Sequence, residues 1–189
     1  SDAFAAMISR DVGAKFPRIT PDTTIQLRRR FIFGLAEQDR VAATIEFLAQ
    51  GDMPTVFELV RLSHAGDYDE EVEDAELLQI AAAARRADPR GRLAFVPGGY
   101  GRMTPDYDRF VGKLNDFLRS YGDDAGGIQR LGAGWGGNVG GLISRRFLEG
   151  DQRLALERLL RDDLNVTVDL DSCVATPGHG AGLLPSPLA

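Results

Sequence analysis

Residues 128–143 read IQRLGAGWGGNVGGLI, and this stretch carries the strongest prediction about the fold. Ile128 and Leu131 lie in a short segment with the composition of a strand, and Val139–Ile143 is predicted as a second strand. Between them lies the glycine-rich segment Gly132-Ala133-Gly134-Trp135-Gly136-Gly137. Glycines let backbone amides approach a ligand without side-chain obstruction, and consecutive amides can hold an anion. The segment is therefore a candidate binding loop.

The glycine-rich segment has three other possible interpretations. A P-loop requires Gly-Lys-Ser/Thr after the glycines, and the sequence has no such triplet there. A Rossmann fingerprint requires the glycines to open a helix, whereas here they precede a predicted strand. A hairpin whose glycines serve packing alone stays open beside the anion-binding loop.

The chain before this segment is predicted to be helical. Two antiparallel helices joined by Gly51-Asp52 are expected over residues 24–65, with Asp52 as the cap of the second. The first helix carries an apolar stripe at helical spacing, formed by Val41, Ile45 and Leu48. An Ala-rich helix over residues 75–86 and a helix from Thr104-Pro105 to Gly122 follow.

The chain after the glycines is predicted to alternate between helix and strand. A helix over residues 151–164 carries Leu156, Leu159 and Leu160 on one face. Strands are expected at Val166–Leu170 and Cys173–Ala175, with Ala181–Leu184 at an edge. This order predicts a single α+β domain over residues 1–189, with an antiparallel sheet, helices on one face and an N-terminal helical pair.

The composition predicts an ordinary globular protein. Of 189 residues, 43% are hydrophobic and 26% are charged, and the net charge is -6. An acidic balance argues against nucleic-acid and anionic-membrane surfaces, which need clustered Lys and Arg. The single cysteine forms no internal disulfide, which favours a cytoplasmic location. No run approaches the roughly 20 apolar residues of a membrane span.

The residues with reactive side chains give no catalytic or metal site in this chain. His64 and His179 are the only histidines, and neither has a companion at metal-ligand spacing. His64, at a helix end, is expected to serve packing or hydrogen bonding. Cys173 is expected to be a small buried residue of a strand.

Three parts of the sequence together resemble the GHMP kinases, and the galactokinases in particular. Residues 132–137 resemble the family's third motif, Gly-Ala-Gly-Phe-Gly-Gly, with Trp135 in place of the phenylalanine. Asp39-Arg40-Val41 and Leu62-Ser63-His64 are similar to the start and end of that family's helical pair. Ala175–Gly182, ATPGHGAG, is similar to its closing segment.

This resemblance implies a ferredoxin-like C-terminal domain of an ATP- and Mg²⁺-dependent kinase that phosphorylates a sugar. Gly132, Ala133, Gly134, Trp135, Gly136 and Gly137 would contribute to the phosphate and acceptor site. In that family the N-terminal half supplies the phosphate loop and the catalytic Asp, and no stretch of this chain matches either. The chain alone is therefore expected to be inactive, with the N-terminal half and a small sugar as partners. An uncovered domain junction would favour self-association.

Two alternatives to a kinase domain stay open. Some relatives of galactokinases are regulators, so a non-catalytic module responsive to a sugar or nucleotide is one of them. The other is an unrelated ferredoxin-like domain with purely structural glycines.

Overall fold

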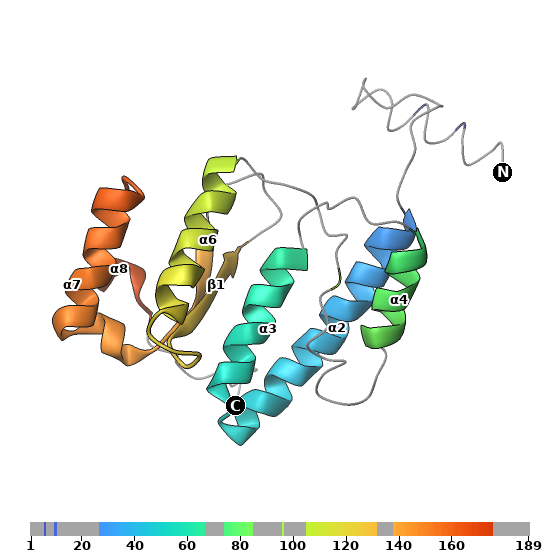
Figure 1. Cartoon of the computed structure of the whole chain (residues 1–189), viewed down its shortest axis with the longest axis horizontal. Helices are drawn as coiled ribbons and strands as arrows, with labels where there is room; N and C mark the ends of the chain where they lie inside the picture. The colour runs from blue at the N-terminus through green and yellow to red at the C-terminus, as the bar shows by residue number, and fades with distance from the viewer. Residues whose placement is uncertain are drawn as a thin grey trace, which may run out of the picture.

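The computed structural model describes residues 27–66, 74–84, 96, 105–131 and 138–175, together with residues 6 and 10 singly. Figure 1 shows the C-terminal helices at one end, the hairpin with α6 and α3 beside it, and α2 with α4 at the other end. In chain order the elements are α2 (Leu27–Gln50), α3 (Met53–Gly66), α4 (Asp74–Ala84), α6 (Pro105–Arg119), β1 (Gly126–Arg130), β2 (Val139–Ile143), η2 (Arg145–Leu148), α7 (Gly150–Arg158), η3 (Leu159–Asp163) and α8 (Leu170–Cys173). The α+β class is confirmed, and helices predominate in the described part.

The predicted helical pair is confirmed, and its turn has well-defined capping. Gly51 has φ +75°, donates to Leu48 O, and is followed by an Asp52 amide that donates to Phe47 O. These two bonds are the Schellman arrangement, for which a glycine after the helix is favoured. Asp52 Oδ1 then accepts from the amide of Thr55 at 3.2 Å and caps α3.

The sheet in the described part of the chain is the antiparallel hairpin of β1 and β2. Gly126 pairs with Ile143 and Arg130 with Val139, so the two strands are aligned along their whole length. The prediction of Val139–Ile143 as a strand is confirmed. Both α3 and α6 pack on β1, and α3 also packs on α2, so α3 joins the hairpin to α2.

Two apolar clusters lie on either side of this junction. The larger one lies among α6, the start of β1, η2, α7, η3 and α8, and its buried members are Leu114, Leu118, Ala125, Phe147, Leu156, Leu160 and Leu170. The smaller one lies between α2 and α3 and consists of Ala43, Phe47, Val56 and Leu59. The predicted apolar face of the 151–164 helix is confirmed, because Leu156 and Leu160 are buried and Leu159 packs against the larger cluster.

The predicted strands at Val166–Leu170 and Cys173–Ala175 are wrong. Asn165 turns the chain with φ +54°, and the amide of Val166 donates to Leu160 O at 2.8 Å. Asp169 then accepts from the amide of Asp171 and caps the short helix α8. The helix cap formed by Asp169 and the packing of Val168 against the core thus replace strand pairing. Cys173, expected to be buried, is exposed. The expected edge at Ala181–Leu184 lies outside the described residues.

The apolar stripe predicted on the first helix exists, but it faces solvent. Val41 is 62% exposed, Ile45 65% and Leu48 45%, whereas Phe33, Ala43 and Phe47 face the interior. No helix in the described segments is both long enough and apolar enough to cross a membrane.

Candidate functional site at the glycine-rich hairpin

The predicted binding segment, Gly132–Gly137, lies outside the described residues, but the residues on both sides of it are described. The amide of Leu131 donates to Asn138 O at 3.0 Å, which continues the pairing of the hairpin to the last residue before the segment. Tyr107 Oη, from α6, donates to the same carbonyl at 2.6 Å. The glycine-rich segment therefore connects the ends of β1 and β2, which are bonded to each other and to α6.

Among the residues that the structure describes, side chains and not a third strand bond to the outer edge of β1. Asn115 on α6 bonds both the amide and the carbonyl of Ile128, each at 2.9 Å. Arg61 on α3 donates to Gly126 O at 2.6 Å and is itself paired with Glu58. Glu58 also accepts from Arg119 of α6. These contacts fix the strand that leads into the glycine-rich segment against two helices.

Glycines within the strands permit close backbone approach. A Cβ at Gly127 would lie 2.6 Å from Phe57 O, so α3 packs directly against the β1 backbone there. A Cβ at Gly141 would collide with Gly127 O across the hairpin. The packing interpretation of glycines thus holds for these two positions, which flank the predicted binding segment on either strand.

Arg130, the last residue of β1, places a cation at the base of the glycine-rich segment. Its side chain is half-buried and its charge acts on His64, in the last turn of α3. Burial, with a further contribution from Arg130, lowers the pKa of His64 to about 4. His64 is 7% exposed, so it is a buried neutral imidazole near neutral pH, as its expected packing role requires.

The structure brings together two of the motifs on which the family resemblance rests. Arg40, from Asp39-Arg40-Val41, donates to Glu37, and Ser63 Oγ, from Leu62-Ser63-His64, donates to Glu37 Oε2 at 2.5 Å. Arg40 is 4% exposed, and burial lowers its pKa to about 10. The two segments that resemble the family therefore meet at one partly buried polar cluster that holds α2 on α3, although residues 39–41 lie in the middle of α2 and not at its start.

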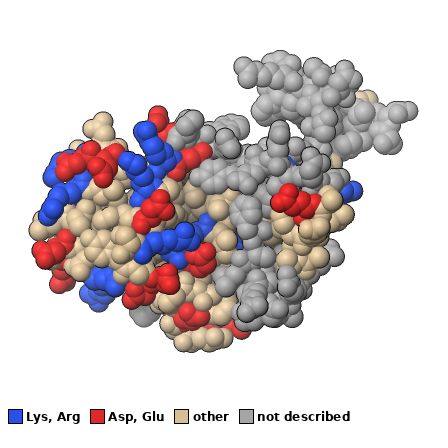
Figure 2. All heavy atoms as spheres, in the orientation of Figure 1, with Lys and Arg blue, Asp and Glu red and all other residues tan. Residues whose placement is uncertain are grey.

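Many of the other charged groups in the described part of the chain lie on its surface. Figure 2 shows basic and acidic side chains interspersed over the α6–α7 face. Within the described ranges, no group of three or more His, Cys, Asp or Glu side chains is placed to hold a metal ion. Near Cys173, Arg153 pairs with both Asp171 and Glu157 and fastens α8 to α7.

Among protein-family models, curated proteins and solved structures, nothing matches this chain.

Sequence reasoning missed Arg130 and Asn115 as parts of this region. Arg130 directly precedes Leu131 and the glycines. A cation so close in sequence to a candidate anion-binding loop could have indicated its role. Asn115 follows Leu114 on the buried side of a helix, where a polar residue indicates a specific hydrogen bond. Of the described groups near the hairpin tip, Arg130 thus supplies positive charge, whereas the side-chain amide of Asn115 is engaged with the backbone of Ile128.

Proposed function

We propose that this chain is the C-terminal, ferredoxin-like domain of a cytoplasmic, galactokinase-like small-molecule kinase. In this proposal residues 132–137 close on the phosphate and the sugar acceptor. The observation that carries the proposal is the hairpin: the glycine-rich segment joins the ends of two paired strands and has Arg130 at its base. The partly buried Arg40–Glu37–Ser63 cluster supports it independently, because it joins the two segments of the helical pair that resemble the family, residues 39–41 and 62–64.

The chain's own contribution would be positioning and electrostatic stabilisation. Phosphoryl transfer spreads negative charge over the transferred oxygens, and preorganised donors stabilise it. Backbone amides of the glycine-rich segment would supply such donors, and Arg130 would add a full charge. ATP supplies the phosphoryl group and Mg²⁺ neutralises its charge. In this proposal both would be held mainly by the N-terminal half, as the family resemblance implies.

A titration followed by ¹H–¹⁵N NMR tests the binding part of this proposal. The 189-residue chain is titrated separately with inorganic phosphate, MgATP and galactose 1-phosphate. We expect the amide signals of residues 132–137 and of Arg130 to shift saturably. Arg130→Met should weaken phosphate binding about 10-fold, as loss of a charged hydrogen bond predicts. Arg109→Met is the matched control, because Arg109 pairs with Asp106 on an exposed turn of α6.

Turnover by the protein as isolated from its source tests the kinase part. We expect ATP-dependent phosphorylation of at least one sugar by that protein, abolished by Gly134→Arg, and none by the 189-residue chain. Binding without turnover in the source protein would replace the kinase by a ligand-responsive regulator. Absence of both binding and turnover would leave the glycines as structural and reject the proposal.

A further inference from the structure

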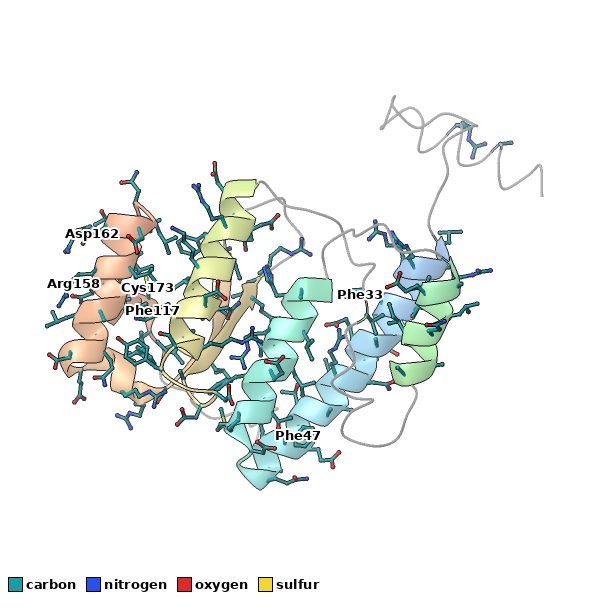
Figure 3. The ribbon with its side chains drawn as sticks, viewed as in Figure 1. Phe33, Phe47, Phe117, Arg158, Asp162 and Cys173 are labelled. Carbon is teal, nitrogen blue, oxygen red and sulfur yellow. The ribbon has the colours of Figure 1, made fainter. Side chains whose placement is uncertain are left out.

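Helix α2 is apolar on two opposite sides. One side faces α3 and contains Phe33, Ala43 and Phe47, which are all buried. Figure 3 shows Phe33 and Phe47 near the two ends of this side. A surface helix needs only one such face, so the second apolar side calls for a partner.

The second side consists of six large apolar side chains that are 44–69% exposed: Leu27, Phe31, Leu35, Val41, Ile45 and Leu48. At 3.6 residues per turn they fall within about 140° of the helix surface, centred opposite Phe33 and Phe47. We call these six residues the outer stripe.

The outer stripe has the size of half an ordinary interface. It runs for about 30 Å along α2 at 1.5 Å per residue. Residues of this size, exposed to that degree, present on the order of 600–700 Å² in all. Two such stripes facing each other would bury roughly 1,200–1,400 Å², within the range of specific protein interfaces. That is enough for a reversible dimer.

The charges beside the outer stripe favour pairing with an antiparallel copy. Arg28 and Glu46 are both exposed and lie five helical turns apart on the same flank of α2. Asp39, also exposed, lies on this flank too. The flank is thus basic at its N-terminal end and acidic towards its C-terminal end. In a two-fold pair of antiparallel helices, this flank of one copy faces the same flank of the second copy, which runs in the opposite direction. Arg28 of each copy then faces Glu46 of the other, so two pairs of opposite charge form.

Gly34 lies near the middle of the outer stripe, and the described residues make no contact that requires a glycine there. It is exposed, and a Cβ built on it would meet nothing within 4 Å. Glycine in a helix interior is destabilising relative to alanine, so packing among the described residues gives no reason for a glycine at this position. Close approach of a second backbone does give one, because glycine is suited to such contacts.

We infer that the outer stripe of α2 is a homodimer interface, in which α2 of a second copy lies antiparallel with the two-fold axis near Gln38. This interface uses none of the residues of the glycine-rich hairpin. The test of this interface is therefore independent of the proposed kinase role.

Sedimentation velocity over 1–100 µM tests the association. We expect a reversible shift to twice the mass of the chain. Val41→Glu combined with Ile45→Glu should raise the dissociation constant at least 100-fold while leaving the circular dichroism spectrum unchanged, because both side chains are exposed in the monomer. Leu154→Glu is the control, since Leu154 is 49% exposed on α7. A wild-type chain that stays monomeric at 100 µM, or equal weakening by the control, would overturn the inference.

Cysteine cross-linking tests the antiparallel geometry. In a Cys173→Ser background, Gln38→Cys should form an intermolecular disulfide in a glutathione buffer, because position 38 faces itself across the axis. Leu27→Cys should not, since its two copies would lie about 30 Å apart, far beyond disulfide reach. Efficient cross-linking at position 27 and none at position 38 would contradict the arrangement. Arg28→Glu and Glu46→Arg should each weaken the dimer several-fold, and the double reversal should restore it.

Discussion

The side-chain amide of Asn115 bonds both backbone groups of Ile128: Nδ2 donates to the carbonyl and Oδ1 accepts from the amide, each at 2.9 Å. The side chain thereby occupies the place that the backbone of a third strand would take at the edge of β1. Asn115 is 8% exposed, so water does not substitute freely for either bond. The position of β1, and with it the base of the glycine-rich segment, depends on this contact.

Replacement of Asn115 by leucine should lower the free energy of unfolding by about 2–4 kcal/mol. The substitution keeps the volume but leaves a partly buried amide and carbonyl without partners. Asn115→Asp, which retains only the acceptor, should also destabilise the chain. Urea denaturation measures both effects, with Asp116→Asn as a control on the exposed side of α6. If Asn115→Leu leaves the stability within 0.5 kcal/mol of wild type, the contact does not have the role we give it.

The sequence predicted the helices and the hairpin well because local signals determine them. Gly51-Asp52 marks a helix end and a helix start, and both are seen in the bonds of the turn. Val139–Ile143 is a strand although it contains two glycines, because it pairs with β1 along its length. The prediction of a strand at Val166–Leu170 was wrong because it relied on β-branched residues, which favour strands only locally. There the tertiary structure uses Val166 to end a helix and Asp169 to begin another.

The candidate site was predicted only in part, for a different physical reason. The glycine-rich segment is visible as a pattern, whereas Asn115, Arg61 and Arg130 act through contacts that the fold creates. Arg61 reaches Gly126, 65 residues away along the chain, and no local pattern predicts such a pair. The exposure of Val41 and Ile45 was missed likewise, because helical periodicity does not tell which of two apolar faces is buried.

Alanine at Gly127 should destabilise the chain by about 2 kcal/mol or more, whereas alanine at Gly112 should stabilise it. A Cβ at position 127 meets backbone of α3, 2.6 Å from Phe57 O, and neither segment can yield without losing its packing. Gly112 lies inside α6 with nothing within 4 Å of the added methyl, so the gain is that of helix propensity, up to about 1 kcal/mol. Thermal unfolding of both variants measures this contrast. Equal effects of the two substitutions would argue against close packing of α3 on β1.

Acidification should destabilise the chain through His64. Its pKa in the folded chain is about 4, lowered mainly by burial and then by Arg130, whereas 6.5 is the ordinary value. Between these values the unfolded chain binds the proton and the folded chain does not, so stability present above pH 6.5 is lost as the pH falls towards 4. The loss attributable to this group between pH 7.5 and pH 5 is about 2 kcal/mol.

Comparison of wild type with His64→Gln isolates this contribution from that of the carboxylates. Urea denaturation at pH 7.5 and pH 5.0 gives the change in stability for each chain. The change should be about 2 kcal/mol smaller in the variant, because glutamine does not titrate. Identical pH dependence of the two chains would show that His64 is accessible to protons in the folded state.

Phe47 and Phe147 belong to different apolar clusters, yet we expect substitutions at both to shift one and the same unfolding transition. The reason is α3, which packs on α2 through Val56 and Leu59 and on β1 at Gly127. Phe147 is fully buried and packs against Phe117 and Tyr121, with ring centroids 5.9 and 5.2 Å away. Alanine at position 147 or 47 should cost about 3–5 kcal/mol.

Thermal unfolding followed by two spectroscopic probes tests this coupling between the clusters. Far-ultraviolet circular dichroism follows all the helices, and near-ultraviolet dichroism follows the packing of the aromatic side chains, which include the Phe117–Tyr121–Phe147 group. In both alanine variants the two probes should give one midpoint, because loss of either cluster removes the support of α3. Leu154→Ala, on an exposed site of α7, should leave that midpoint nearly unchanged. Two separate midpoints in Phe47→Ala would mean that the helical pair unfolds independently and that the chain contains two cooperative units instead of one.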